Sequence, residues 1–117
     1  MSIIWHTYNW EGLSKKMLYE ALTLRSLVFV VEQNCVYQDL DSKDENGIHV
    51  LGYKQNLLVA YARVFPNAKP ASIGRVVIHP LFRGLGIWQA CYAKMHQTNT
   101  GKYNGPHFCS RTLKGVL

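Results

Sequence analysis

The chain has 117 residues, of which 48% are apolar, and a formal net charge of +6. This length fits one domain, and the apolar content is that of a globular protein and not of a disordered one. No apolar run approaches the ~20 residues that cross a bilayer, and the N-terminus lacks the basic start and cleavage site of a signal peptide, so we expect a cytoplasmic protein without a membrane segment.

The first half of the chain predicts a strand, a helix and a polar connection. Residues 2–8 alternate enough to form a strand. From Ser14, a suitable N-cap, the apolar residues follow the three- and four-residue spacing of an amphipathic helix as far as Phe29. Residues 36–47 are rich in acids and turn-forming residues, and we expect them to be an irregular connection.

The second half predicts a hairpin, a further strand and a glycine loop. Residues 48–54 and 57–65 have strand patterns and flank a tight Gln55-Asn56 turn, and residues 73–80 form another strand closed by proline. The sequence R-G-L-G follows and leads into a helical pattern. The order of elements predicts an α+β domain with a mainly antiparallel sheet.

The R-G-L-G segment, residues 83–86, has the composition of an anion-binding loop. Glycines let a backbone approach an anion closely, and the free amides at a helix N-terminus point towards it. Taken alone, the motif is weak and also suits an ordinary turn between a strand and a helix.

Charge is divided unevenly along the chain. All seven acidic residues lie at or before Glu45, and residues 46–117 contain basic residues but no acid. A basic half can attract nucleic acid or a small polyphosphate, although a solvated surface explains it equally well. Since no helix or aromatic platform for bases is recognisable, nucleic acid is the weaker alternative.

Two sets of motifs resemble the GNAT N-acetyltransferases. I-H-P-L-F-R-G-L-G-I (78–87) is similar to their acetyl-CoA-binding motif. L-R-S-L-V-F-V-V-E-Q-N-C-V-Y-Q-D-L-D (24–41), H-V-L-G-Y (49–53) and L-V-A-Y-A-R-V (58–64) resemble the ElaA-like branch. The resemblance extends from about Ile4 to Ile87. It implies the GNAT acyl-CoA N-acyltransferase fold, of the α+β class, with a mixed, mostly antiparallel sheet flanked by helices.

The resemblance also implies an activity: transfer of an acetyl group from acetyl-CoA to a primary amine, whose identity stays open together with the oligomeric state. Backbone groups on the last strand would bind the pantetheine arm, and loop amides would bind the pyrophosphate. The implied binding residues are Val76, Val77, Ile78, Arg83, Gly84, Leu85, Gly86 and Ile87. A backbone N–H would polarise the thioester carbonyl while a base takes the proton of the amine.

Candidates for this base are the acids of the segment that resembles the acceptor side. We assign Glu32 as the catalytic residue, with Asp39, Asp41 and Asp44 as alternatives; each also suits a structural role in a turn or helix end. His49, which opens a strand, is expected to be structural.

The cysteines predict neither a disulfide framework nor a metal site. Cys35, Cys91 and Cys109 include no CxxC pair and are odd in number, so we expect Cys35 to be a buried thiol. With His96 and His107 added, the spacing remains too irregular for zinc.

Trp88 departs from the family pattern, which has glycine or alanine at this position. Between Gln89 and Arg111 there is no Leu, Ile or Val, so a helix here is expected to lack an apolar face. We therefore divide the chain into residues 1–87, the N-terminal part of a GNAT domain, and residues 88–117, a divergent tail that leaves the fold incomplete at its C-terminus.

A single-base frameshift after Ile87 is one hypothesis for this tail. Reading codons of the tail in the shifted frame restores the glycine, an amphipathic helix and a late family motif. A divergent, short C-terminus is the alternative. In either case we expect these 117 residues to bind acetyl-CoA poorly or not at all, and a non-catalytic remnant or interaction protein of GNAT ancestry is the alternative to an active enzyme.

Overall fold

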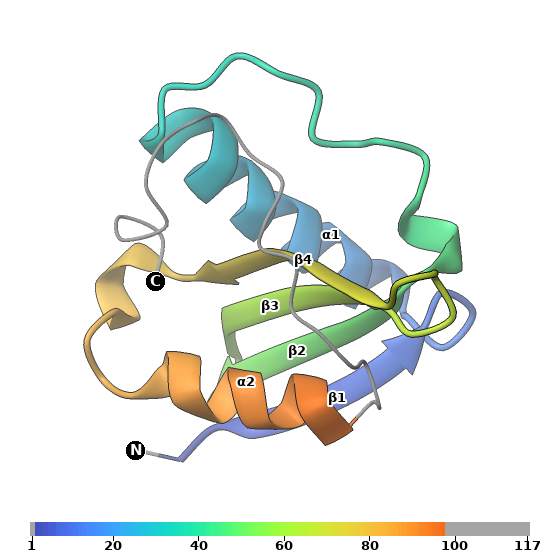
Figure 1. The fold of residues 1–117 in the computed structure, drawn as a ribbon. Coiled ribbons are helices and arrows are strands. Elements are labelled where there is room, and N and C mark those ends of the chain that lie inside the picture. Colours follow the sequence, from blue (N-terminus) through green and yellow to red (C-terminus); the bar gives the residue numbers. More distant parts are fainter. Residues whose placement is uncertain (1, 98–117) are drawn as a thin grey trace.

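The computed structural model describes residues 2–97 and contains one antiparallel sheet with strands in chain order (Figure 1). Neighbouring strands pair throughout, so the chain folds as a simple meander. The predicted strands are confirmed to within two residues at their ends. They are β1 (Ile4–Asn9), β2 (Ile48–Lys54), β3 (Leu57–Phe65) and β4 (Ser72–Ile78).

The helix after β1 begins where the sequence predicts. The Ser14 hydroxyl accepts a hydrogen bond of 3.1 Å from the amide of Met17 and so caps α1 (Lys15–Arg25). The helix continues without a break as the π-helical segment η1 (Ser26–Glu32). The wider turn of η1 lies just before the acid-rich connection, which contains one short 3₁₀ turn, η2 (Asp44–Asn46).

Two helices cover opposite faces of the sheet, α1 on one face and α2 (Ile87–Gln97) on the other (Figure 1). Successive side chains along a strand point to opposite faces of the sheet, so neighbouring residues pack into the hydrophobic cores on different faces. Leu51, Tyr61 and Val77 pack with Leu24 and Phe29 on the α1 side. Val50, Ala62 and Val76 are among the buried residues of the other side, where α2 packs.

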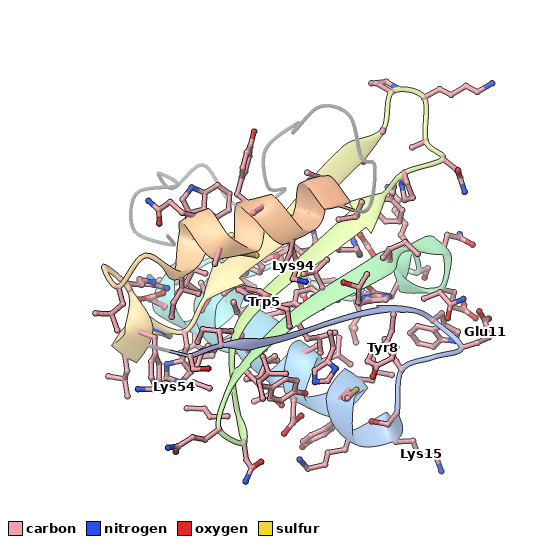
Figure 2. All side chains as sticks on the ribbon, turned by 90° about the horizontal axis from the view of Figure 1, so that it is seen from below. Trp5, Tyr8, Glu11, Lys15, Lys54 and Lys94 are labelled. Carbon is pink, nitrogen blue, oxygen red and sulfur yellow. The ribbon has the colours of Figure 1, made fainter. Side chains whose placement is uncertain are left out.

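The structure corrects the expectation that no apolar face follows Trp88. Ile87, Cys91 and Met95, spaced four residues apart, are almost fully buried on one side of α2. Met and Cys are apolar enough to fill such a stripe in place of Leu, Ile or Val. Trp5, labelled in Figure 2 on the α2 side of the sheet, packs against the same cluster.

Two further observations concern sequence predictions. Cys35 is buried, as expected, but it is disulfide-bonded and not a free thiol, whereas Cys91 is free and buried. Within residues 2–97, no helix is both long and apolar enough to span a membrane.

Candidate active site

A loop containing two glycines connects the end of β4 to α2. After the 3₁₀ turn η3 (Pro80–Phe82), Gly84 and Gly86 have φ angles of +79° and +80°, a region that side chains disfavour. Apart from Gly84 and its two chain neighbours, no residue has an atom within 4 Å of the place where a Cβ of Gly84 would be, so the backbone is open there. A cavity of about 250 Å³ adjoins the loop and is lined by Ile78, Phe82, Arg83, Gly84, Gly86, Ile87, Trp88 and Gln89.

Trp88 is the second residue of α2 and forms part of the cavity wall. Its side chain is half-buried, packs against the cluster beneath α2, and has its ring centroid 5.7 Å from that of Tyr92. The fold therefore accommodates the tryptophan, but the indole borders the space beside the glycine loop.

β4 is an edge strand within the described residues: β3 pairs with one side of it, and none of the described strands pairs with the other. The side chains of Val76, Val77 and Ile78 are buried, so what this edge offers is backbone. A bulge lies between the pairs Tyr61–Val77 and Arg63–Gly74. Arg75 in this bulge has a φ of +51°.

Glu32, the residue assigned as catalytic, contacts the glycine loop. Both terminal nitrogens of Arg83 donate to its carboxylate, each at 2.6 Å. Arg83 Nε also donates to the carbonyl of Ile78 at 3.2 Å. The structure thus joins the end of η1 to the end of β4 through one exposed, bidentate ion pair.

The three alternative acids lie in a different place, in a cluster with three buried arginines. Arg25 Nε donates to Asp39 at 2.9 Å, and Arg25 Nη1 to Asp44 at 2.8 Å. Arg63 bonds both Asp44 and Asp41, at 2.8–2.9 Å. Arg75 Nε donates to Asp39 at 2.8 Å. We call these six residues the arginine–aspartate cluster: Arg25, Arg63, Arg75, Asp39, Asp41 and Asp44.

The cluster makes poor proton acceptors of two of its acids. Burial opposes ionisation of Asp41 and Asp44, but hydrogen bonds from Arg63 to both, and from Arg25 to Asp44, outweigh it and hold the pKa of each carboxyl below its usual range. Both are therefore deprotonated at neutral pH. A weakly basic carboxylate held by arginine is better suited to structure than to proton abstraction.

His49 is structural, as expected. It is buried, its Nδ1 lies 2.6 Å from the Tyr61 hydroxyl, and its Nε2 lies 2.9 Å from the carbonyl of Asp44. Burial lowers the pKa of His49, so the imidazole is neutral near pH 7 and links the cluster to the sheet.

A larger cavity, of about 720 Å³, adjoins the cluster at the Ser72 end of β4, opposite the glycine loop. It is lined by both charged and apolar side chains, namely Tyr37, Gln38, Asp41, Lys43, Asn46, Arg63, Phe65, Ala68, Ser72 and Arg75. The two cavities therefore lie at the two ends of the same strand.

Comparison with known proteins decides the family. No protein-family model matches the chain. The ElaA protein of Escherichia coli K12 is 43% identical over 103 residues, which cover 84% of this chain and 67% of that protein. The chain belongs to the ElaA-like family of GNAT acetyltransferases. A UPF0039 protein of Synechocystis is 37% identical over 107 residues, which cover 88% of this chain and 70% of that protein.

Solved structures confirm the α+β GNAT fold of this ElaA-like protein. The crystal structure of Escherichia coli ElaA has a TM-score of 0.79 and 41% identity, covering 83% of this chain and 69% of that one. An acyl-CoA N-acyltransferase of Pseudomonas aeruginosa also has a TM-score of 0.79, with 34% identity and coverage of 83% and 68%.

Sequence reasoning missed the roles of Arg25, Arg63 and Arg75. The signal that pointed to them was the uneven charge distribution. In the fold, acids from the first half neutralise arginines from the second half, namely Arg63, Arg75 and Arg83. These three arginines therefore do not form a free cationic surface, which weakens the nucleic-acid alternative.

Metal binding has no visible basis in the part of the chain that the structure describes. No group of three or more His, Cys, Asp or Glu residues there could hold an ion. The side chains of His96, His107 and Cys109, which entered the zinc argument, lie outside the described residues.

Proposed function

We propose that this ElaA-like protein transfers an acetyl group from acetyl-CoA to a primary amine. The supporting observation is the open glycine loop, with Gly84 and Gly86 in left-handed conformations at the start of α2. The loop lies beside the edge of β4 that no strand pairs with among residues 2–97. Backbone amides at a helix start bind phosphate oxygens, and a strand edge binds an amide-containing chain such as pantetheine. The resemblance to the Pseudomonas acyl-CoA N-acyltransferase supports the same co-substrate class.

In this proposal the amides of residues 83–87 bind the pyrophosphate, and the backbone of Val76, Val77 and Ile78 binds the pantetheine arm. The amine nitrogen bonds to the thioester carbonyl carbon and the carbon–sulfur bond breaks. One proton must therefore leave the nitrogen, and one must reach the departing sulfur. A backbone N–H near the bulge would stabilise the developing charge on the carbonyl oxygen.

Glu32, which the sequence predicts to be the base, has its carboxylate bound by Arg83 at the glycine-loop end of β4. It can accept a proton from an amine only after that ion pair opens. Its role as a base stays a prediction.

Two measurements on the 117-residue chain test the proposal. Calorimetric titration with acetyl-CoA tests binding, and release of free CoA thiol in the presence of small amines, peptides and lysine derivatives tests transfer. Amine-dependent thiol release would support it. A folded chain that neither binds acetyl-CoA nor releases thiol with any amine would refute it for this form of the protein.

Trp88 favours a second candidate, a non-catalytic or interaction protein of GNAT ancestry. The indole borders the cavity beside the loop, where the family pattern has glycine or alanine. If the tryptophan obstructs the ligand, Trp88→Ala should bind acetyl-CoA measurably more tightly than the wild-type chain. Equal absence of binding in both proteins, with folding intact, would favour the second candidate.

The frameshift hypothesis is tested independently by resequencing the source gene across codon 88. A gene with one nucleotide fewer at this codon would mean that glycine occupies position 88 in the natural product, and that residues 88–117 are out of frame. An unchanged reading would leave Trp88 as the true residue and a divergent C-terminal segment.

A further inference from the structure

Arg83 is held in a fixed orientation beside the glycine loop. Its Nε donates to the carbonyl of Ile78, the last residue of β4, at 3.2 Å. Its side chain is only 18% exposed, and it lines the cavity that the loop adjoins. Its guanidinium therefore lies where the proposed function needs a positive charge for the phosphates.

The guanidinium is already occupied. Nη1 donates to one carboxylate oxygen of Glu32 and Nη2 to the other, both at 2.6 Å. Arginine binds carboxylate and phosphate through the same pair of parallel N–H groups. With Nε committed to Ile78, a carboxylate on this fork and a phosphate on this fork exclude each other.

The carboxylate beside the loop does not come from the neighbouring sequence, because residues 46–97 contain no acid. It comes from a distant part of the chain, the end of η1. Glu32 is one-third exposed, which leaves it room to turn away from Arg83 into water.

We propose that Glu32 is an internal competitor of the ligand's phosphates, holding Arg83 in place in the free protein and giving it up when a polyphosphate binds. The inference rests on the proposed function, because it requires phosphates at the glycine loop. It gives Glu32 a positioning role in place of proton abstraction.

The test is the affinity for CoA of the full chain and four variants at constant salt: Glu32→Gln, Glu11→Gln, Arg83→Gln and the double variant Glu32→Gln/Arg83→Gln. Glu11→Gln removes the same charge and is the matched control. Glu11 is exposed and lies beyond β1 at the opposite end of the sheet from the glycine loop (Figure 2).

We expect Glu32→Gln to bind CoA about two- to fivefold more tightly than wild type, the range given by an exposed ion pair of up to about 1 kcal/mol. Glu11→Gln should change the affinity by less. Arg83→Gln should bind CoA more weakly than wild type. The double variant Glu32→Gln/Arg83→Gln should bind CoA no more tightly than Arg83→Gln alone.

Several outcomes would overturn the inference while leaving the proposed function standing. In the first, the wild type binds CoA, but Glu32→Gln binds it no more tightly than Glu11→Gln does. Another is an unchanged affinity accompanied by slower acetyl transfer with an altered pH profile, which would make Glu32 the base. If neither the wild type nor any variant binds CoA, the proposed function itself fails.

Discussion

The connection between η1 and η2 is held at its two ends by arginine–carboxylate pairs in opposite environments. At the η2 end, Arg25 is fully buried and Asp44 nearly so, and each member of the arginine–aspartate cluster shares its partners with others. At the η1 end, Glu32 and Arg83 form a single pair whose side chains are 33% and 18% exposed.

The difference in burial separates structural pairs from exchangeable ones. A buried ion pair that loses one member leaves a charge without water or partner, so its members are committed to each other. An exposed pair contributes little to stability, because water and salt can replace either partner. A ligand can therefore compete for Arg83 but not for Arg25.

Asp44→Asn should disrupt the arginine–aspartate cluster and have the largest effect on stability. It removes the charge that Arg25 and Arg63 share through Asp44 Oδ1, at 2.8 and 2.9 Å. We expect the free energy of unfolding to fall by about 3–5 kcal/mol. Urea denaturation measures it, with the exposed neighbour Glu45→Gln as control. A loss below 1 kcal/mol would show that the cluster is not the rigid end of the connection.

Lowering the pH should reduce the stability of the protein in two stages, through His49 and then through the aspartates of the cluster. The pKa of His49 is lowered in the fold, so below about pH 6.5 the unfolded chain binds a proton that the folded chain refuses. The lowered pKa values of Asp41 and Asp44 act with the same sign below about pH 4. Stability should thus be complete near neutral pH and fall with each stage.

The measurement is urea denaturation at a series of pH values. His49→Gln should make the upper stage shallower without removing it, because the pKa of His79 is also lowered. The lower stage should be unchanged in this variant. A stability that stays constant from pH 7 to pH 3 would contradict the assigned pKa directions.

Substitutions of Trp88 should destabilise the start of α2, beside the glycine loop, without disturbing the arginine–aspartate cluster. Trp88→Ala removes a half-buried indole and should cost roughly 1–2 kcal/mol, less than for a fully buried ring. Trp88→Gly should cost about 1 kcal/mol more, because glycine disfavours the helix. Thermal unfolding of both variants measures the difference. Equal stability of the two would show that this turn of α2 is not helical in solution.

Glu32→Gln should have the smallest effect on stability. The pair with Arg83 is partly exposed, so we expect the free energy of unfolding to change by less than about 1 kcal/mol. Comparing this value with that of Asp44→Asn in the same denaturation series tests the contrast directly. Similar losses in the two variants would mean that both ends of the connection are equally rigid.

Local patterns predicted most of the fold. The strand bounds of residues 48–54 and 57–65 agree with β2 and β3, because the hairpin and its alternation are set by neighbouring residues. The stretch after Trp88 was mispredicted because the expectation counted only Leu, Ile and Val. Cys91 and Met95 fill the stripe, and the sheet beneath them determines that the helix buries it.

The candidate site was predictable only in part. The R-G-L-G motif located the loop, because glycine's conformational range is a local property. The roles of the acids were not accessible in this way. Asp41 and Asp44 look alike in an acid-rich connection, and their partner Arg63 lies about twenty residues further along the chain.

By itself, the sequence determined the order of elements, the glycine loop and membership in the ElaA-like family, since these depend on local periodicity, backbone preference and motif spacing. Only the tertiary structure decided which charged residues form ion pairs. It buries Asp44 between Arg25 and Arg63, and it places the pair of Glu32 and Arg83 at the surface. The pKa and the replaceability of an ion pair depend on its depth and its partners, and both are set by contacts distant in the chain.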